Sequence, residues 1–118
     1  MVKYSEQAKD KISFLLKNDN IKVIDISVEN AILEILLNGI EFPKTWKNPK
    51  FSPANQYKDS LDVLGYFHNK DDWNISFQKD TEMFEVYVVD KKYSVANKSL
   101  SRAIMLALWN CNQLKVEV

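Results

Sequence analysis

The sequence has little cysteine, little glycine and no excess of charge, and each shortage excludes a class of protein. A single cysteine, Cys111, cannot form a disulfide within the chain, which excludes a disulfide-stabilised scaffold. The two glycines, Gly39 and Gly65, stand far apart, so no glycine-rich phosphate loop is present. Sixteen basic and sixteen acidic residues balance, so the chain as a whole does not attract a polyanion such as nucleic acid.

Long apolar runs are also missing. No stretch approaches the roughly 20 apolar residues that cross a bilayer, and no signal-peptide pattern is visible. We therefore expect a cytoplasmic protein with no membrane partner. Hydrophobic residues make up 46% of the 118 residues, which excludes a disordered chain and fits one domain with one core.

The first half of the chain predicts two helices separated by a strand. Residues 4–17 have the apolar spacing of an amphipathic helix. Residues 21–26 are rich in β-branched side chains, which favours a strand. Ser27 can cap a second helix that ends at Gly39, with an inward stripe of Val28, Ala31, Ile32, Ile35 and Leu36.

The second half predicts a helix, a meander of strands and a final helix. All three prolines fall within residues 42–53, which indicates an extended loop, and Ser52-Pro53 favours a helix start with a helix to about Phe67. Alternation predicts strands over residues 73–78, 84–89 and 93–96, with the second strand central and turns at residues 78–82 and 90–92. Ser99 can cap a last helix over residues 100–111.

These elements predict an α+β fold in which an antiparallel meander of three or more strands is sandwiched between helices in α-β-α layers. Residues 1–118 form a single domain. Within it, residues 1–26 are expected to be an N-terminal extension of a helix and a strand, and residues 27–112 the core. Residues 113–118 alternate in polarity and are expected to add an edge strand or to pair with residues 21–26.

Several of these segments together resemble a family of phage proteins. Phe51-Ser52-Pro53, a helix centred on Asp62-Val63-Leu64, a strand led by Trp73, an aromatic and valine-rich strand, and Ser99-Leu100-Ser101-Arg102-Ala103-Ile104 occur in this order. This succession is similar to the phage ABA-sandwich family and to NinX-type phage proteins, over residues 27–112. The resemblance implies a phage or prophage origin and a small sheet with helices on both faces. It implies no catalytic residue, because the family has no assigned activity.

Acid and base chemistry is represented by one local group. His68, Asp71 and Asp72 could form a general base or part of a metal site, but a solvated turn before the strand at Trp73 is the simpler interpretation. Cys111 has no neighbour in sequence that would activate it, so we expect it to pack in the core. We therefore predict no catalytic residue, no metal ligand, no cofactor and no enzymatic activity.

The last helix is apolar on nearly every side. Met105 and Trp109 lie one turn apart and predict a ridge at an angle to the sheet-facing stripe, while Ser101, Arg102 and Asn110 are left to meet water. Such a ridge suits a protein partner or a homodimer through this helix. The alternative is that the helix of residues 4–16 or the proline-rich loop covers the ridge within the same chain.

The loop of residues 42–53 combines basic and aromatic side chains. Lys44, Lys47 and Lys50 surround Trp46 and Phe51, a combination that suits phosphate contact and base stacking. The alternative, which we favour, is that the aromatic rings pack on the core while the lysines keep the loop soluble.

The leading hypothesis is a non-enzymatic phage or prophage accessory protein that binds a host bacterial protein. Inhibition of a bacterial defence system, whether anti-CRISPR-like or of another kind, would be one form of that function. Nucleic-acid binding through residues 42–53 is the alternative.

Overall fold

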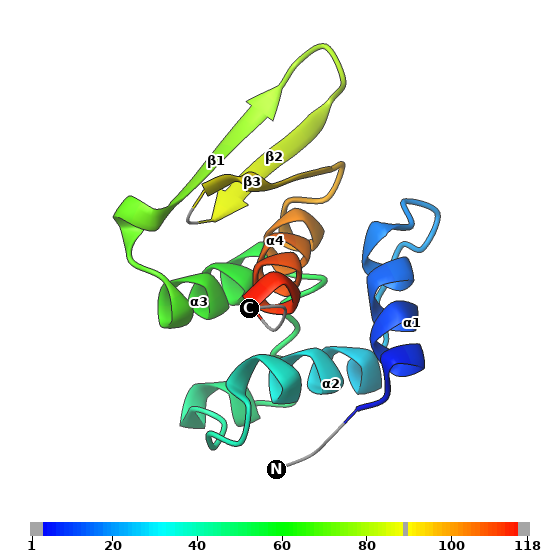
Figure 1. Ribbon diagram of the computed structural model, residues 1–118, viewed down its shortest axis with the longest axis vertical. Helices are drawn as coiled ribbons and strands as arrows, with labels where there is room; N and C mark the ends of the chain where they lie inside the picture. Colours follow the sequence, from blue (N-terminus) through cyan, green and yellow to red (C-terminus); the bar gives the residue numbers. More distant parts are fainter. Residues whose placement is uncertain (1–3, 89, 116–118) are drawn as a thin grey trace.

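Four helices and one small sheet make up the protein, which the computed structural model describes over residues 4–88 and 90–115. The three strands form an antiparallel meander in the order β1-β2-β3 (Figure 1). In chain order the elements are α1 (Glu6–Lys17), α2 (Ile26–Leu37), the 3-10 turn η1 (Lys44–Lys47), α3 (Tyr57–Phe67), the 3-10 turn η2 (Lys70–Asp72), β1 (Trp73–Gln78), β2 (Met83–Val88), β3 (Asp90–Asn97) and α4 (Leu100–Lys115). The predicted α+β class and the central position of the second strand are confirmed.

The sheet has one buried and one exposed face. Ile75 lies opposite Val86 in the β1–β2 ladder, and Val86 and Val88 are completely buried beneath α4, which packs on β2 and β3. Asn74 and Gln78 point to the other face and are exposed. The hairpin of β1 and β2 projects away from the helices in Figure 1. Of the helical layers expected around the sheet, α4 forms the one on the buried face.

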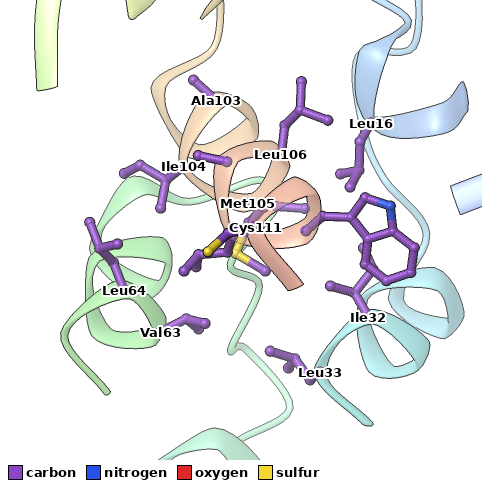
Figure 2. Close-up of a cluster of buried hydrophobic side chains, with 14 of the residues drawn as sticks. Leu16, Ile32, Leu33, Val63, Leu64, Ala103, Ile104, Met105, Leu106 and Cys111 are labelled. Atoms are coloured by element: carbon purple, nitrogen blue, oxygen red, sulfur yellow. The ribbon is translucent and has the colours of Figure 1, made fainter. Parts of the chain in front are cut away.

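The centre of the core is α4. Every residue from Ser101 to Trp109 is buried, since the sheet covers one side of the helix and α1, α2 and α3 pack on the rest. Figure 2 shows Leu16 of α1, Ile32 of α2 and Leu64 of α3 arranged around α4. Because Ile12 and Leu16 belong to the same cluster, α1 is part of the core and not an appendage. A helix that is apolar all round is stable only when it is enclosed in this way.

The segment between α1 and α2 does not form the strand predicted for residues 21–26. The backbone of Ile24 instead bonds to one side chain, since its N–H donates to Asn55 Oδ1 at 2.8 Å and its carbonyl accepts from Asn55 Nδ2 at 2.9 Å. A buried backbone needs hydrogen bonds but not a neighbouring strand. The helix α2 then begins at Ile26, before the predicted cap Ser27, with Asp25 in the N-cap position.

The helix predicted to begin at Ser52-Pro53 begins only at Tyr57. The Ser52 carbonyl accepts the Gln56 N–H at 2.8 Å, which closes a single turn. Gln56 then has extended φ and ψ angles of −128° and 123°, so the turn does not continue into α3. The Ser52 hydroxyl does not cap a helix, because it donates to the carboxylate of Glu29.

Other element ends also differ from the predictions. At the end of α2, Asn38 is in the left-handed conformation and Gly39 follows with a φ of 93°, so the predicted stop is shared by both residues. Residues 90–92, predicted as a turn, belong to β3. Residues 113–115 belong to α4 and not to an edge strand, and the remainder of that prediction, residues 116–118, lies outside the described residues.

None of the helices within the described residues is long and apolar enough to cross a membrane.

Candidate functional site

The ridge predicted on the last helix lies inside the protein. Met105 and Trp109 are both completely buried, and Trp109 Nε1 donates to the Ser13 hydroxyl of α1 at 2.7 Å. The prediction of an exposed ridge is wrong, and the alternative, in which the N-terminal helix covers it, is confirmed. Ser101 and Arg102, which were expected to meet water, are buried as well. The stretch from Ser101 to Trp109 thus offers no exposed surface for a homodimer.

The aromatic residues of the proline-rich loop pack on the core. Trp46 is 6% exposed and stacks on Phe51, with ring centroids 5.6 Å apart and an interplanar angle of 11°. A second ring, that of Tyr66 from α3, packs edge-on against Trp46, with ring centroids 5.1 Å apart. Trp46 is therefore not available to stack on a base, as the alternative interpretation of this loop expected.

The lysines of the loop remain on the surface. Lys44, Lys47 and Lys50 are all exposed, and Lys47 Nζ lies 3.1 Å from the carboxylate of Glu41. Exposed pairs of this kind contribute little to stability. Phosphate contact by these lysines stays a prediction, without the predicted stacking partner.

The residues of the predicted acid–base group occupy the end of α3 and the turn after it. His68 is the C-cap of α3, and its backbone N–H donates to the Leu64 carbonyl at 2.9 Å. Asp71 and Asp72 lie in η2 and are exposed. Within residues 4–88 and 90–115, no group of three or more His, Cys, Asp or Glu side chains could hold a metal ion. Cys111 is 2% exposed and belongs to the core, as predicted.

A groove of about 680 Å³ lies between α1, the segment that follows it and the first turn of α2. Most of its lining is apolar. The large apolar side chains of the lining include Leu15, Ile21, Val23, Ile26, Val28 and Phe51. Val23 is 71% exposed and Ile26 is 54% exposed, so both side chains meet solvent. Exposed apolar side chains that line one groove are typical of a binding surface.

A second hollow of about 180 Å³ continues this groove between α1 and α2. It is lined by Tyr4, which precedes α1, by Ala8 of α1 and by Ala31 of α2. The two hollows share four lining residues, Lys11, Leu15, Ser27 and Val28. We call the continuous feature the α1–α2 groove.

A buried carboxylate lies at the base of the α1–α2 groove. Glu29 is 3% exposed, and both of its oxygens accept hydrogen bonds. Ser52 Oγ donates to Oε1 at 2.9 Å, and the Ala54 N–H donates to Oε2 at 2.8 Å. Asn55 Nδ2 donates to Ser52 Oγ at 2.9 Å, which links the carboxylate to the side chain that holds Ile24. These bonds anchor the segment of residues 52–55 to α2.

Burial raises the pKa of Glu29 above its ordinary value of 4.5. The hydrogen bonds from Ala54 and Ser52 act in the opposite direction, because they stabilise the ionised carboxylate. The negative charge of Asp59 adds to the rise. The loss of hydration thus outweighs the hydrogen bonds and makes ionisation of Glu29 costly in the folded protein.

Arg102 fixes the wall of the groove that α1 provides. Its Nη2 donates to the Ile21 carbonyl at 2.7 Å, and its Nη1 donates to the carbonyls of Asn18 at 3.3 Å and Leu15 at 3.5 Å. The last carbonyls of a helix have no partner within it, so the guanidinium satisfies the end of α1. Burial lowers the pKa of Arg102, and the charge of Asp19 opposes that shift.

The residues of this site were missed by the sequence analysis. Val23 and Ile26 were assigned to a strand, and Glu29 was not singled out. One signal could have found Glu29, because it lies three and four residues before Ile32 and Leu33, on the apolar stripe of α2. A charged residue on such a stripe is buried with partners.

Comparisons with protein-family models, with curated proteins and with solved structures found no match. The resemblance of residues 27–112 to phage ABA-sandwich proteins stays a prediction. The function is therefore inferred from the geometry and chemistry of the α1–α2 groove.

Proposed function

We propose that this protein works without catalysis, as a binding protein that holds an apolar segment of a protein partner in the α1–α2 groove. The observation that carries the proposal is the exposure of Val23 and Ile26 on a groove of about 680 Å³. Fully burying a side chain of this kind contributes roughly 1.5–3 kcal/mol. A partner that covers both would gain several kcal/mol from these two residues alone.

The groove is supported on every side by hydrogen bonds to distant parts of the chain. Arg102 holds the end of α1, Asn55 holds Ile24, and Glu29 holds the segment of residues 52–54. A surface that is held in shape before binding loses less conformational freedom on binding. Because the groove already has its shape before binding, it suits a partner that docks into it and does not require this chain to fold around the partner.

The polar groups of the groove support a non-catalytic role. The carboxylate of Glu29 is engaged by Ser52 and by the Ala54 backbone, so its hydrogen-bonding capacity is used to join α2 to another segment. Lys11 and Asp25 lie on the exposed part of the lining and provide a charged rim. An apolar centre with a charged rim is the usual arrangement of a protein–protein interface.

The partner that we propose is a bacterial host protein, as the resemblance to phage proteins implies. An amphipathic helix would suit the groove, because such a helix presents apolar side chains along one stripe. A defence protein as the target, and inhibition as the consequence, stay predictions of the same resemblance.

The test is affinity capture of partners from nuclease-treated bacterial lysate, followed by a titration of the purified partner. The double variant Val23→Glu/Ile26→Glu is expected to lower affinity about 100-fold or more, because it places two charges where apolar contact is needed. Both residues are exposed, so the fold is expected to persist, and a thermal unfolding curve checks this.

The matched control is Ile40→Glu. Ile40 is 59% exposed and follows the far end of α2, away from the groove. Binding that is unaffected by the groove variant, or weakened equally by the control, would refute the site.

The nucleic-acid alternative has its own readout. It predicts retention that disappears after nuclease treatment and an affinity that falls steeply with salt. The variant Lys44→Glu/Lys50→Glu would abolish such binding, whereas the groove variant would leave it unchanged.

A further inference from the structure

The outer edge of β1 is unpaired in the part of the chain that the structure describes. β1 is the first strand in the sheet order and pairs with β2 on one side, from Trp73 opposite Val88 to Gln78 opposite Met83. Within residues 4–88 and 90–115, no backbone hydrogen bond from β1 to a segment other than β2 is found. Its other side therefore presents the free N–H and C=O groups of every second residue of the strand.

This edge also has none of the features that protect sheet edges from pairing. Its sequence, Trp-Asn-Ile-Ser-Phe-Gln, contains no charged residue and no proline, and its register with β2 has no irregularity. The opposite edge differs, because the register of β3 with β2 shifts between Val86 and Val88. Charges and bulges are the common means by which proteins prevent edge pairing.

The side chains of β1 add an apolar row to this edge. Trp73 and Ile75 are half-buried, and Phe77 is 51% exposed while its ring lies 5.1 Å from that of Phe84. All three point to the same face of the sheet, since they alternate along the strand. The edge therefore offers both hydrogen bonds and apolar contact to an added strand.

We propose that two copies of this chain associate by antiparallel pairing of their β1 strands, in a register centred on Ile75. Ile75 then lies opposite Ile75 of the partner subunit, and Trp73 lies opposite the partner's Phe77. On the other face, Asn74 lies opposite the partner's Ser76. The two three-stranded sheets become one sheet that continues across the molecular two-fold axis.

The self-complementarity of β1 selects a second copy of the chain as the occupant. In antiparallel pairing, residues that lie opposite one another share a face, so a residue at the centre of the register must lie opposite its own copy, with the two-fold axis midway between the two copies. Among these registers, centring on Ile75 is the one that places all three apolar side chains of β1, Trp73, Ile75 and Phe77, opposite an apolar side chain of the partner. Aromatic and β-branched pairs of this kind stabilise a ladder by roughly 0.2–1 kcal/mol each.

The contact is small, so the dimer is expected to be weak. A short pair of strands buries less than the roughly 1,200 Å² of a standard interface. The association is therefore expected at protein concentrations from about 10 µM to about 1 mM. Sedimentation velocity over this range, with the full chain, measures the dissociation constant.

Two double variants that differ at one position test the register. Asn74→Lys/Ser76→Lys places lysines opposite lysines across the two-fold axis, whereas Asn74→Glu/Ser76→Lys places glutamates opposite lysines. Within one chain, residue 76 faces Glu85 and residue 74 faces Tyr87, so both variants keep the same favourable Lys–Glu pair inside the sheet. Thermal unfolding checks that both variants are folded.

At low ionic strength, the Lys/Lys variant is expected to dissociate at least about tenfold more readily than the Glu/Lys variant, because like charges directly opposite one another destabilise a ladder. That ratio, together with a wild-type dimer, supports the proposal. A wild-type protein that stays monomeric up to about 1 mM overturns it, and so do equal dissociation constants of the two variants. Neither outcome affects the α1–α2 groove, which lies on other elements.

Discussion

Two buried charged side chains, Arg102 and Glu29, join segments that are far apart in the sequence, and they do so in different ways. Arg102 reaches from α4 to three backbone carbonyls at the end of α1 and just after it. Glu29 reaches from α2 to a hydroxyl and a backbone N–H of residues 52–54. Arginine keeps its charge at any ordinary pH, whereas a carboxylate can take up a proton. The contribution of Arg102 to stability is therefore constant with pH, whereas the contribution of Glu29 varies with pH.

The strongest way to break the Arg102 connection is Arg102→Ala. The variant leaves three carbonyls near the end of α1 without their donors and opens a space beside α4, so we expect the free energy of unfolding to fall by about 4 kcal/mol. Urea denaturation measures the loss, with exposed Lys22→Ala as the control. A loss below about 1 kcal/mol would contradict the structural role of Arg102.

The geometry of the guanidinium is tested by Arg102→Lys. A lysine keeps the charge but donates from a single point, so it cannot reach both the Ile21 and Leu15 carbonyls as the two nitrogens of Arg102 do. We expect a loss of about 2 kcal/mol in the same denaturation experiment. If the loss equalled that of Arg102→Ala, charge would have no part in this connection.

The Glu29 connection is weakened by Ser52→Ala. This variant removes a donor to the buried carboxylate and an acceptor for Asn55, with an expected loss of about 1–2 kcal/mol at neutral pH. Because the serine hydrogen bond lowers the pKa of Glu29, its removal is expected to raise that pKa further. The loss of stability should therefore be larger above the pKa of Glu29 in the folded protein than at pH 4, and a loss that is constant with pH would disagree with this account.

The smallest change in the free energy of unfolding is expected for Glu29→Gln. This variant is informative because the change should depend on pH. The folded protein binds the Glu29 proton more tightly than the unfolded chain does, so this residue lowers stability as pH rises from about 4.5 through its folded pKa. Glutamine lacks this titration and has nearly the same shape. The stability of the variant relative to the wild type should rise over that window and then level off.

Unfolding free energies at pH 4, 5, 6, 7 and 8 for both proteins isolate the titration of Glu29 and its coupling to Asp59, because the carboxylates that do not interact with Glu29 act equally in both. A difference that does not change with pH would show that the folded pKa of Glu29 is not raised. The same series on Arg102→Ala is the contrast, since no pH dependence is expected there.

Local sequence patterns predicted the helices and strands whose apolar residues recur at regular spacing, because each of these elements packs one face on the core. The strands β1 and β2, the helix α1 and the cap of α4 at Ser99 were found in this way, and the Arg102 N–H does bond to Ser99 Oγ at 3.2 Å. The composition of α4 also indicates that the helix is covered, although the same composition suits a surface for a partner. Composition shows that a helix is covered, but not by which chain.

The groove could not be predicted, because its structure depends on contacts across the sequence. Ile24 bonds to a side chain 31 residues away, and Arg102 bonds to carbonyls more than 80 residues before it. No local pattern records such partners. β-branched residues at 21–26 favour a strand on their own, and a single asparagine removes the need for one by taking both backbone hydrogen bonds.

The position of α4 in the chain has a consequence for synthesis. Translation proceeds from the N-terminus at roughly 5–20 residues per second, so α1, α2, α3 and the sheet emerge from the ribosome before the helix on which they all pack. Until residues 100–111 have been released, the earlier segments expose the apolar surfaces that α4 will cover. Nascent chains that stall before this helix are therefore expected to bind chaperones, and release of α4 is expected to complete folding in one cooperative step.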